Sequence, residues 1–305
     1  MPTSFPREFE HAPFSVHEAL ERGVDASRLR RRDLRADFHG VRVPVHLEPG
    51  FVTACRAYAT RLRPGQFFSH VTAARLWGMR LSSRWEVGPL HVTTVLPART
   101  PRTRGVVGHH CEHPGPDLAV VDGLVLSTPA ETWRALSSLL SLDELVVAGD
   151  GLVSRTDPLA TMRMLRRAVA LNAGRRGNRR LRGALDLVRP GSDSPRETRL
   201  RLCLIRAGLP EPEVNGLITE RGEPERFGDL VYRAERVVVE YEGAHHQRSR
   251  LAYLGDIERF ETLAARWTFV RVTREHSDAE VVARVRRALA GSRDAGFDSP
   301  APRSA

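Results

Sequence analysis

The chain has 305 residues, of which 41% are hydrophobic, and it carries 47 basic and 37 acidic side chains for a formal net charge of +10. This length exceeds what one compact core usually holds, so two or three domains are expected. Every basic side chain is an arginine, because the sequence contains no lysine. Arginine binds phosphates through its bidentate fork but cannot accept a proton as a base. The charge balance favours a polyanionic partner, most simply nucleic acid.

Cysteine usage and hydropathy exclude two classes of protein. The three cysteines, at positions 55, 111 and 203, are widely scattered, which argues against a disulfide framework and for a reducing compartment. The first residues, MPTSFPREFE, have acids and prolines where a signal peptide needs an apolar core. No apolar run approaches the roughly 18 to 20 residues that a membrane helix requires. We therefore expect a soluble, cytoplasmic protein with no membrane partner.

Residues 13–50, after a tail over 1–12, have the pattern of a small DNA-binding unit. The sequence predicts one short helix that begins near Phe14 and ends at Gly23. A second helix, capped by Asp25 or Ser27, is expected before the alternating strand FHGVRVPV. Helix, turn, basic helix and strand is the order of a winged-helix unit. Its expected DNA contacts are Arg28, Arg31 and Arg32. The alternative is a helical hairpin whose arginine face is merely solvated.

Residues 51–170 are predicted to form a mixed α+β domain, with a helix after Phe51, a helix over 69–77 and a helix that begins at Pro129. The segment GHHCEHP contains residue types that bind metals, namely His109, His110, Cys111, Glu112 and His113. Zinc sites draw their ligands from separated places, and no second cluster with ligand spacing is visible. We therefore interpret this segment as the face of an ordinary surface strand.

The last domain is expected over 194–290, after a basic segment and linker over 171–193 with a boundary near Pro190, and before a disordered tail over 291–305. A helix should begin after Ser194, which is a suitable N-cap with Glu197 three residues later. The helix should end at Gly208. A β-hairpin should follow, with strands over 227–232 and 237–241 joined by a four-residue turn.

The register of this hairpin gathers three acids. Asp229 should lie opposite Glu240, with Cβ atoms about 4.5 to 5.5 Å apart on the same side of the sheet. The pleat then returns Glu242 to that side. Because opposed like charges repel, a divalent cation with oxygen ligands would hold them together, most simply Mg²⁺, with Mn²⁺ as a substitute. The alternative is an edge hairpin whose acids lie in water beside Arg226, Arg233 and Arg236.

Four motifs in this domain, SPRETRLRLCLIRAGLPEPEVN, GDLVY, VVVEYEGAHH and DIERFETLAARWTFVRVT, occur in a recognisable order. Together they resemble the Vsr-like endonuclease branch of the PD-(D/E)xK superfamily. The resemblance implies a restriction-endonuclease-like core with a helix, a mixed sheet, a second helix and a final strand. It also implies that Asp229 and Glu240 bind the metal and that Glu197 is the acid of the first helix. Glu242 stands where the wider superfamily prefers lysine, and Gly228 replaces the usual proline before Asp229.

The resemblance further implies metal-assisted hydrolysis of a phosphodiester. Mg²⁺ on Asp229 and Glu240 would polarise the phosphate and activate a bound water, and Glu242 would add a ligand or orient that water. His245 or His246 would move the proton, because an imidazole titrates near neutral pH. On the following helix, Arg259 would contact DNA.

Upstream, FHGVRVP, FFSHVTAARLWGM and DGLVLSTPAETW resemble the AbiE-type type IV antitoxin family, in which a winged helix precedes a mixed domain. The sequence thus predicts a mixed α/β protein in which a DNA-targeting module precedes a nuclease-like domain. The expected function is Mg²⁺-dependent DNA cleavage in repair or in defence against phages and mobile elements. RNA is an alternative substrate. The other reading is a non-catalytic DNA-binding regulator, similar to an antitoxin, with a degenerate nuclease fold.

Overall fold

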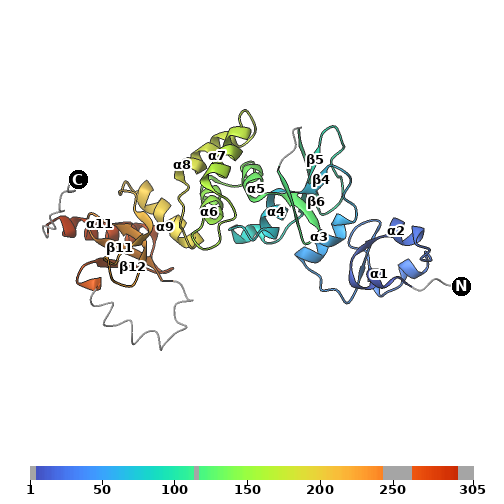
Figure 1. Ribbon diagram of the computed structural model, residues 1–305, viewed down its shortest axis with the longest axis horizontal. Coiled ribbons are helices and arrows are strands. Elements are labelled where there is room, and N and C mark those ends of the chain that lie inside the picture. Colours follow the sequence, from blue (N-terminus) through green and yellow to red (C-terminus); the bar gives the residue numbers. More distant parts are fainter. Residues whose placement is uncertain (1–4, 113–116, 243–262, 295–305) are drawn as a thin grey trace. The chain divides into compact units, whose positions relative to one another are not determined.

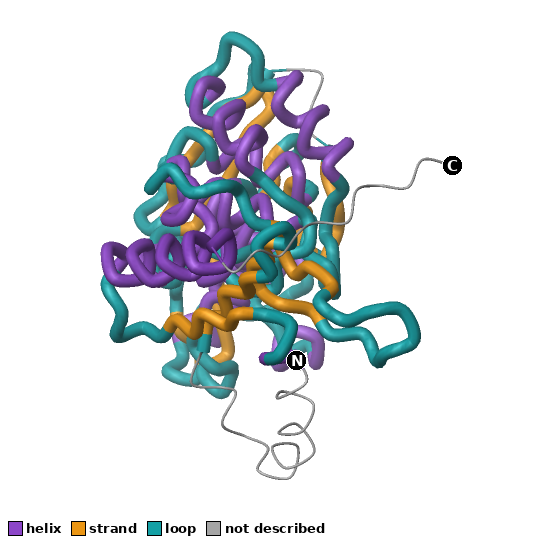
Figure 2. The backbone as a smooth tube through the Cα atoms, turned by 90° about the vertical axis from the view of Figure 1, so that its left-hand side faces the viewer, coloured by secondary structure: helices purple, strands orange, loops and turns teal. Residues whose placement is uncertain are grey.

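The computed structural model describes residues 5–112, 117–242 and 263–294 (Figure 1). It divides into two compact units, of which unit 1 comprises Met1–Leu139 and Ala170–Gly177, and unit 2 comprises Leu140–Val169 and Asn178–Ala305. Helices alternate with sheets that contain both parallel and antiparallel pairs (Figure 2), so the mixed α/β class is confirmed. None of the described helices is long and apolar enough to cross a membrane.

Unit 1 begins with a small three-stranded sheet in the order β1-β3-β2 and two short helices. Their bounds are α1 (Arg7–His11), β1 (Phe14–Ser15), α2 (Val16–Glu21), β2 (Leu34–Arg35) and β3 (Val41–Pro44). The predicted second helix is wrong, because this segment forms only a 3₁₀ turn over Arg28–Arg30. Asp25 Oδ1 accepts a hydrogen bond from the backbone N–H of Ser27 at 2.6 Å, a local bond that competes with a helix. The described part of residues 13–50 therefore lacks a recognition helix.

The remainder of unit 1 is a five-stranded sheet in the order β6-β5-β4-β8-β7 with three helices. The strands are β4 (Gln66–Phe68), β5 (Leu90–Val95), β6 (Val106–Cys111), β7 (Leu118–Val121) and β8 (Leu124–Ser127). The predicted helices are confirmed as α3 (Phe51–Ala59), α4 (His70–Leu76) and α5 (Pro129–Leu136). Phe68, Val92 and Leu126 form the centre of a core that Tyr58 of α3 covers.

Unit 2 opens with helices that the sequence did not assign to the last domain. They are α6 (Leu142–Leu152), α7 (Met162–Leu171) and α8 (Asn178–Leu187), and they precede α9 (Pro195–Arg206). Buried Asp150 of α6 accepts a hydrogen bond from Arg201 of α9 at 2.9 Å, so α6 and α9 share one interior. The compact unit that holds α9 therefore begins at Leu140, well before the boundary predicted near Pro190.

The sheet of unit 2 has the order β12-β11-β10-β9, and β12 runs parallel to β11. The strands are β9 (Glu213–Leu217), β10 (Phe227–Tyr232), β11 (Val237–Tyr241) and β12 (Thr268–Val272), followed by α11 (Asp278–Asp294). The predicted hairpin is confirmed in its bounds, and its register is confirmed for Leu230 opposite Val239 and Tyr232 opposite Val237. The predicted pairing of Asp229 with Glu240 is not part of the ladder, which begins at Leu230. Side chains of α9 and α11, among them Leu204 and Val285, pack on one face of this sheet.

Gly228 of β10 is a position where a larger side chain should not fit. A Cβ atom there would lie 2.5 Å from Cγ1 of buried Val238 and 3.1 Å from Cγ2 of Val231. We expect Gly228→Ala to lower the free energy of unfolding by about 1 to 3 kcal/mol, the usual cost of overpacking a core. Gly291→Ala is the control, because a Cβ there meets nothing within 4 Å and alanine favours the helix. Equal urea midpoints for both variants would contradict the prediction.

Candidate functional site

Asp229 lies in β10 just before Leu230, the first residue that pairs with β11. Instead of a ladder pair, the Asp229 side chain makes the contact: its Oδ2 accepts a hydrogen bond from the backbone N–H of Tyr241 at 2.8 Å. Tyr241 stands between Glu240 and Glu242 in the chain. The Asp229 carboxylate therefore lies against the segment that carries the other two predicted ligands. Asp229 and Glu240 are half-buried, and Glu242 is exposed.

An arginine accompanies the acids at this end of the sheet. Arg271 of β12 is the register partner of Glu240, and its Nε lies 3.3 Å from Oε1 of Glu242. Both members of the ion pair are about half exposed, at 49% and 48%. The backbone N–H of Glu242 also donates to the carbonyl of Val272 at 2.8 Å, which fixes the chain as it leaves β11. The site thus contains a permanent positive charge that cannot transfer a proton.

Glu197 belongs to a separate hydrogen-bond network at the start of α9. Ser194 Oγ accepts from the Glu197 N–H at 3.2 Å, which confirms the predicted N-cap. Oε2 of buried Glu197 accepts from the Asp193 N–H at 2.8 Å and from Nδ2 of Asn215 at 3.2 Å. Asn215 occupies the β9 position opposite Asp229. Glu197 is therefore one strand removed from Asp229, and its observed contacts are those of a capping residue.

Three other predicted residues, His245, His246 and Arg259, lie outside the described residues. The described residues around Asp229 supply carboxylate oxygens, which are the ligands that Mg²⁺ and Mn²⁺ prefer. Asp229, Glu240 and Glu242 do not form one of the close groups of three potential ligands found in the described part of the chain. The geometry therefore offers a metal one or two carboxylates, as Mg²⁺ sites commonly do.

The predicted N-terminal DNA contacts are only partly available. Arg28 makes a two-pronged ion pair with Asp33 at 3.1 and 2.9 Å, and its guanidinium carbon lies 4.0 Å from the ring centre of Phe5. Arg31 and Arg32 are exposed. The expectation that all three extend from one helix is wrong, because that helix does not form.

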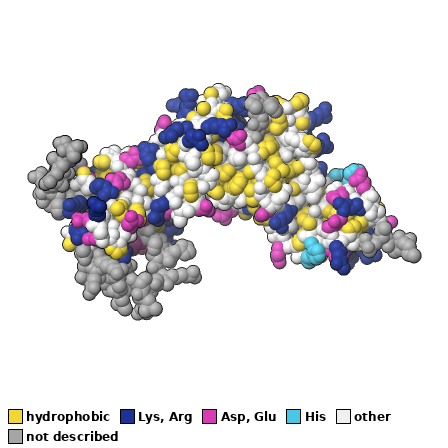
Figure 3. Space-filling model, viewed as in Figure 1, with side chains coloured by type: hydrophobic (Ala, Val, Ile, Leu, Met, Phe, Trp, Pro, Cys, Tyr) yellow, Lys and Arg dark blue, Asp and Glu magenta, His cyan; other side chains and the backbone are white. Residues whose placement is uncertain are grey.

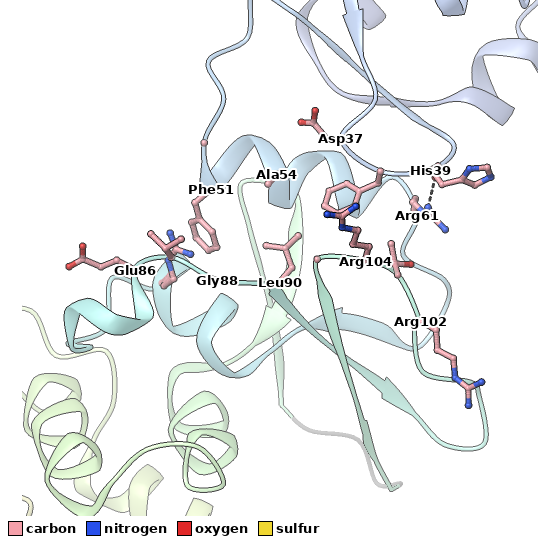
Figure 4. A pocket seen from close by; sticks show the side chains of 16 residues that line it. Asp37, His39, Phe51, Ala54, Arg61, Glu86, Gly88, Leu90, Arg102 and Arg104 are labelled. Atoms are coloured by element: carbon pink, nitrogen blue, oxygen red, sulfur yellow. Dashed lines mark hydrogen bonds between the residues drawn. The ribbon is translucent and has the colours of Figure 1, made fainter.

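Unit 1 also contains a basic groove of about 1020 Å³ beside α3 (Figure 4). Its lining combines apolar Phe51 and Leu90 with four arginines and two acids. These charged residues are Arg61, Arg75, Arg102, Arg104, Asp37 and Glu86. Arg75 stacks on Phe51, with its guanidinium carbon 3.5 Å from the ring centre. The net positive lining suits a phosphate-bearing ligand.

A second basic surface covers α7 and α8 of unit 2, where Figure 3 shows arginine side chains gathered. Between positions 158 and 192 the only acid is Asp186. The exposed arginines of the two helices are Arg163, Arg166, Arg167, Arg179, Arg180 and Arg182. This surface lies in the same unit as the carboxylates. Its α8 part lies in the segment 171–193 that was predicted as basic, whereas most of α7 was predicted as part of the domain over 51–170. Neither helix was assigned to the last domain.

In the part of the chain that the structure describes, a close group of three potential metal ligands lies in unit 1, and the sequence did not predict it. His70 at the start of α4, His91 in β5 and His109 in β6 have ligand atoms that all lie within 4.8 Å of one another. The interpretation of the GHHCEHP strand as an ordinary surface face is wrong for His109, which joins this cluster, whereas His110 is exposed. His113 lies outside the described residues. The sequence signal for the cluster was weak: His70 and His91 are single histidines in the largely apolar segments FFSHVTAA and LHVTTV.

Comparison with protein-family models, with curated proteins and with solved structures found no match. The contacts of Asp229, Glu240 and Arg271 therefore carry the functional argument. Charge adds a second constraint, because both units expose arginine-rich surfaces.

Proposed function

We propose that the chain is a metal-dependent endonuclease that cleaves DNA, with Asp229 and Glu240 as metal ligands. One observation carries the proposal: the Asp229 carboxylate is hydrogen-bonded, at 2.8 Å, to the backbone between Glu240 and Glu242. A half-buried carboxylate that lies against a segment carrying two further carboxylates is costly unless positive charge compensates it. The resemblance to Vsr-like endonucleases implies a helix, a mixed sheet, a second helix and a final strand, and α9, the sheet and β12 agree with the first, second and last of these.

The donor set fits Mg²⁺ or Mn²⁺, because it consists of hard carboxylate oxygens. Bound there, such a cation supplies polarisation of the scissile phosphate and a lower pKa for a coordinated water. The protein residues do the positioning. The Tyr241 N–H orients Asp229, and Arg271 holds Glu242 through the ion pair at 3.3 Å.

Arg271 takes part of the role for which the wider superfamily uses lysine. Its guanidinium is half exposed beside the acids, so it can contact a phosphate oxygen and stabilise the charge that develops there. It cannot accept a proton from the attacking water. Proton transfer therefore belongs to another group, for which His245 and His246 remain the predicted candidates.

The positive charge supports a nucleic acid as the polymer, and the two resemblances favour DNA over RNA. The exposed arginines of α7 and α8 belong to the same unit as the carboxylates, and the basic groove of unit 1 adds further phosphate-binding potential. Contacts of this kind position a duplex without reading its sequence. Together with the two resemblances, they support a proposed role in DNA repair or in defence against phages and mobile elements.

The test is a cleavage assay with full-length protein on plasmid, single-stranded DNA and RNA. We expect DNA cleavage with Mg²⁺ or Mn²⁺, none with EDTA, and a loss of about a hundredfold or more in Glu240→Gln, because a metal ligand contributes several kcal/mol. Glu225→Gln, an exposed acid in the same unit, is the matched control and should cleave normally. Cleavage of RNA alone would change the substrate. DNA binding without any cleavage would favour the non-catalytic regulator.

A further inference from the structure

Three imidazole rings from three elements of unit 1 lie against one another. His91 Nδ1 and His109 Nε2 lie 2.9 Å apart. The rings of His70 and His109 stack with centres 3.7 Å apart. Their ligand atoms all lie within 4.8 Å of one another, which is close enough for one ion to reach all three. We call this group the histidine cluster.

The histidine cluster is enclosed and its rings are held in place. His70 and His91 are 9% and 6% exposed, and His109 is half-buried. Nδ1 of His70 lies 2.9 Å from Ser69 Oγ, which in turn accepts a hydrogen bond from Thr93 Oγ1 at 2.6 Å. This leaves Nε2 of His70 available to a ligand. In a metal-binding histidine, one ring nitrogen binds the metal and the other usually forms a hydrogen bond with a neighbouring polar group, which fixes the orientation of the ring.

The backbone at His70 adds an independent observation. His70 has φ of 49°, in the left-handed region that a residue other than glycine rarely adopts. Such a conformation is strained for a residue other than glycine and occurs preferentially at functional sites. Two hydrogen bonds from backbone N–H groups fix this turn against β5: Ser69 N–H donates to the His91 carbonyl at 3.0 Å, and His91 N–H donates to the Thr72 side-chain Oγ1 at 2.7 Å. The strained turn thus brings the His70 ring to the two strands.

The surroundings of the rings disfavour a positive charge on them. Burial lowers the pKa of His70 well below its usual value and that of His91 to about 4, and it also lowers the pKa of His109. Arg134 adds a positive charge near His70, but buried Glu131 compensates it through a hydrogen bond from Arg134 Nε at 2.8 Å.

We propose that His70, His91 and His109 bind a divalent transition-metal ion, with Zn²⁺ as the best fit. Imidazole nitrogens suit Zn²⁺, whereas Mg²⁺ prefers oxygen. Three histidines leave the fourth position of a tetrahedral Zn²⁺ for water or a substrate atom. The ion would also fasten β6, an edge strand of the five-stranded sheet, to β5 and to the start of α4. This site is independent of Asp229, which lies in unit 2.

The experiment uses full-length protein that has been treated with EDTA and desalted. Titration with Zn²⁺ should show one equivalent bound per chain by calorimetry and by elemental analysis, with a higher melting temperature. Co²⁺ in place of Zn²⁺ should give the visible absorption of a four-coordinate nitrogen site. His109→Ala should weaken Zn²⁺ binding by at least about tenfold, since even loss of a supporting group costs that much.

Two controls keep the test decisive. His110→Ala alters the exposed neighbour of His109 on the same strand and should bind Zn²⁺ like the parent. Asp229→Asn should also bind it normally, so the two metal proposals can fail separately. If His109→Ala does not fold, as judged by circular dichroism, the Co²⁺ spectrum of the parent decides. Less than one equivalent of Zn²⁺ in the parent, equal affinity in folded His109→Ala, or a six-coordinate Co²⁺ spectrum would overturn the proposal.

Discussion

Replacing Arg201 with alanine is expected to lower the free energy of unfolding by about 3 to 5 kcal/mol, the cost of removing one partner of a buried ion pair. Arg201 is completely buried and donates from Nη2 to Asp150 Oδ2 at 2.9 Å and to the Leu187 carbonyl at 2.8 Å. Its Nη1 donates to Glu211 Oε1 at 3.0 Å. Alanine would leave the fully buried Asp150 without its compensating charge.

The loss should depend on pH. Burial raises the pKa of Asp150, and the charge of Arg201 together with hydrogen bonds from Arg189 N–H and Thr198 Oγ1 opposes that rise. Without Arg201, the folded-state pKa of this carboxyl should rise further above its unfolded value. A raised pKa means that the folded state binds the proton more tightly, so stability is lost as pH increases. The deficit of Arg201→Ala should therefore be smaller at acidic pH than at neutral pH.

A matched control is available on the same two helices. Arg206 of α9 pairs with Asp143 of α6, but both side chains are about half exposed. Arg206→Ala should cost no more than about 1 kcal/mol, because water screens a surface pair. Urea unfolding followed by circular dichroism compares the two variants with the parent. Equal losses for Arg201→Ala and Arg206→Ala would show that burial of the pair has no special energetic role.

Local signals predicted the hairpin and the capped helix of unit 2 well. The apolar alternation before and after a four-residue turn determines which residues face one another, so the pairing of Tyr232 with Val237 could be predicted. The sequence Ser194, Pro195 and Glu197 marks the start of α9 for similarly local reasons. Near Asp25, a helix failed to form because a side-chain hydrogen bond favoured a turn instead.

Long-range partners could not be predicted in this way. Asp150 and Arg201 are 51 residues apart, and the sequence around either residue gives no indication that the two form an ion pair. The histidine cluster depends on the parallel pairing of β5 with β6 and on the left-handed backbone at His70. Each of the three histidines comes from a different element, so no single segment has the spacing of a metal-binding motif.

Asp229→Asn is expected to reduce the DNA cleavage rate by about a hundredfold or more, because a metal ligand contributes several kcal/mol to the transition state. The variant should nevertheless fold normally. Tyr241 N–H donates a hydrogen bond to Asp229 Oδ2 at 2.8 Å, and the side-chain oxygen of asparagine can accept the same bond. Removal of one of three neighbouring negative charges should leave the metal-free protein equally stable or slightly more stable.

Asp229→Ala is the informative companion, because it removes the hydrogen-bond acceptor together with the charge. It should lose cleavage to the same extent and, in addition, about 1 to 3 kcal/mol of stability from the unpaired Tyr241 N–H. The parent should melt at a higher temperature with Mg²⁺ or Mn²⁺, since a ligand that binds only the folded state stabilises it. Neither variant should show that increase.

These melts separate a metal ligand from a purely structural carboxylate. If Asp229 served only to hold the Tyr241 N–H, the parent would melt at the same temperature with and without millimolar Mg²⁺, and Asp229→Asn would match it in both conditions. Asp229→Ala would still be destabilised. That pattern would contradict the proposed nuclease site in unit 2 and favour the alternative proposal of a non-catalytic DNA-binding regulator. The proposal expects a different pattern: Mg²⁺ raises the melting temperature of the parent, and Asp229→Asn loses this increase without becoming less stable. Such a result would require the negative charge of Asp229, because asparagine keeps the hydrogen bond to the Tyr241 N–H.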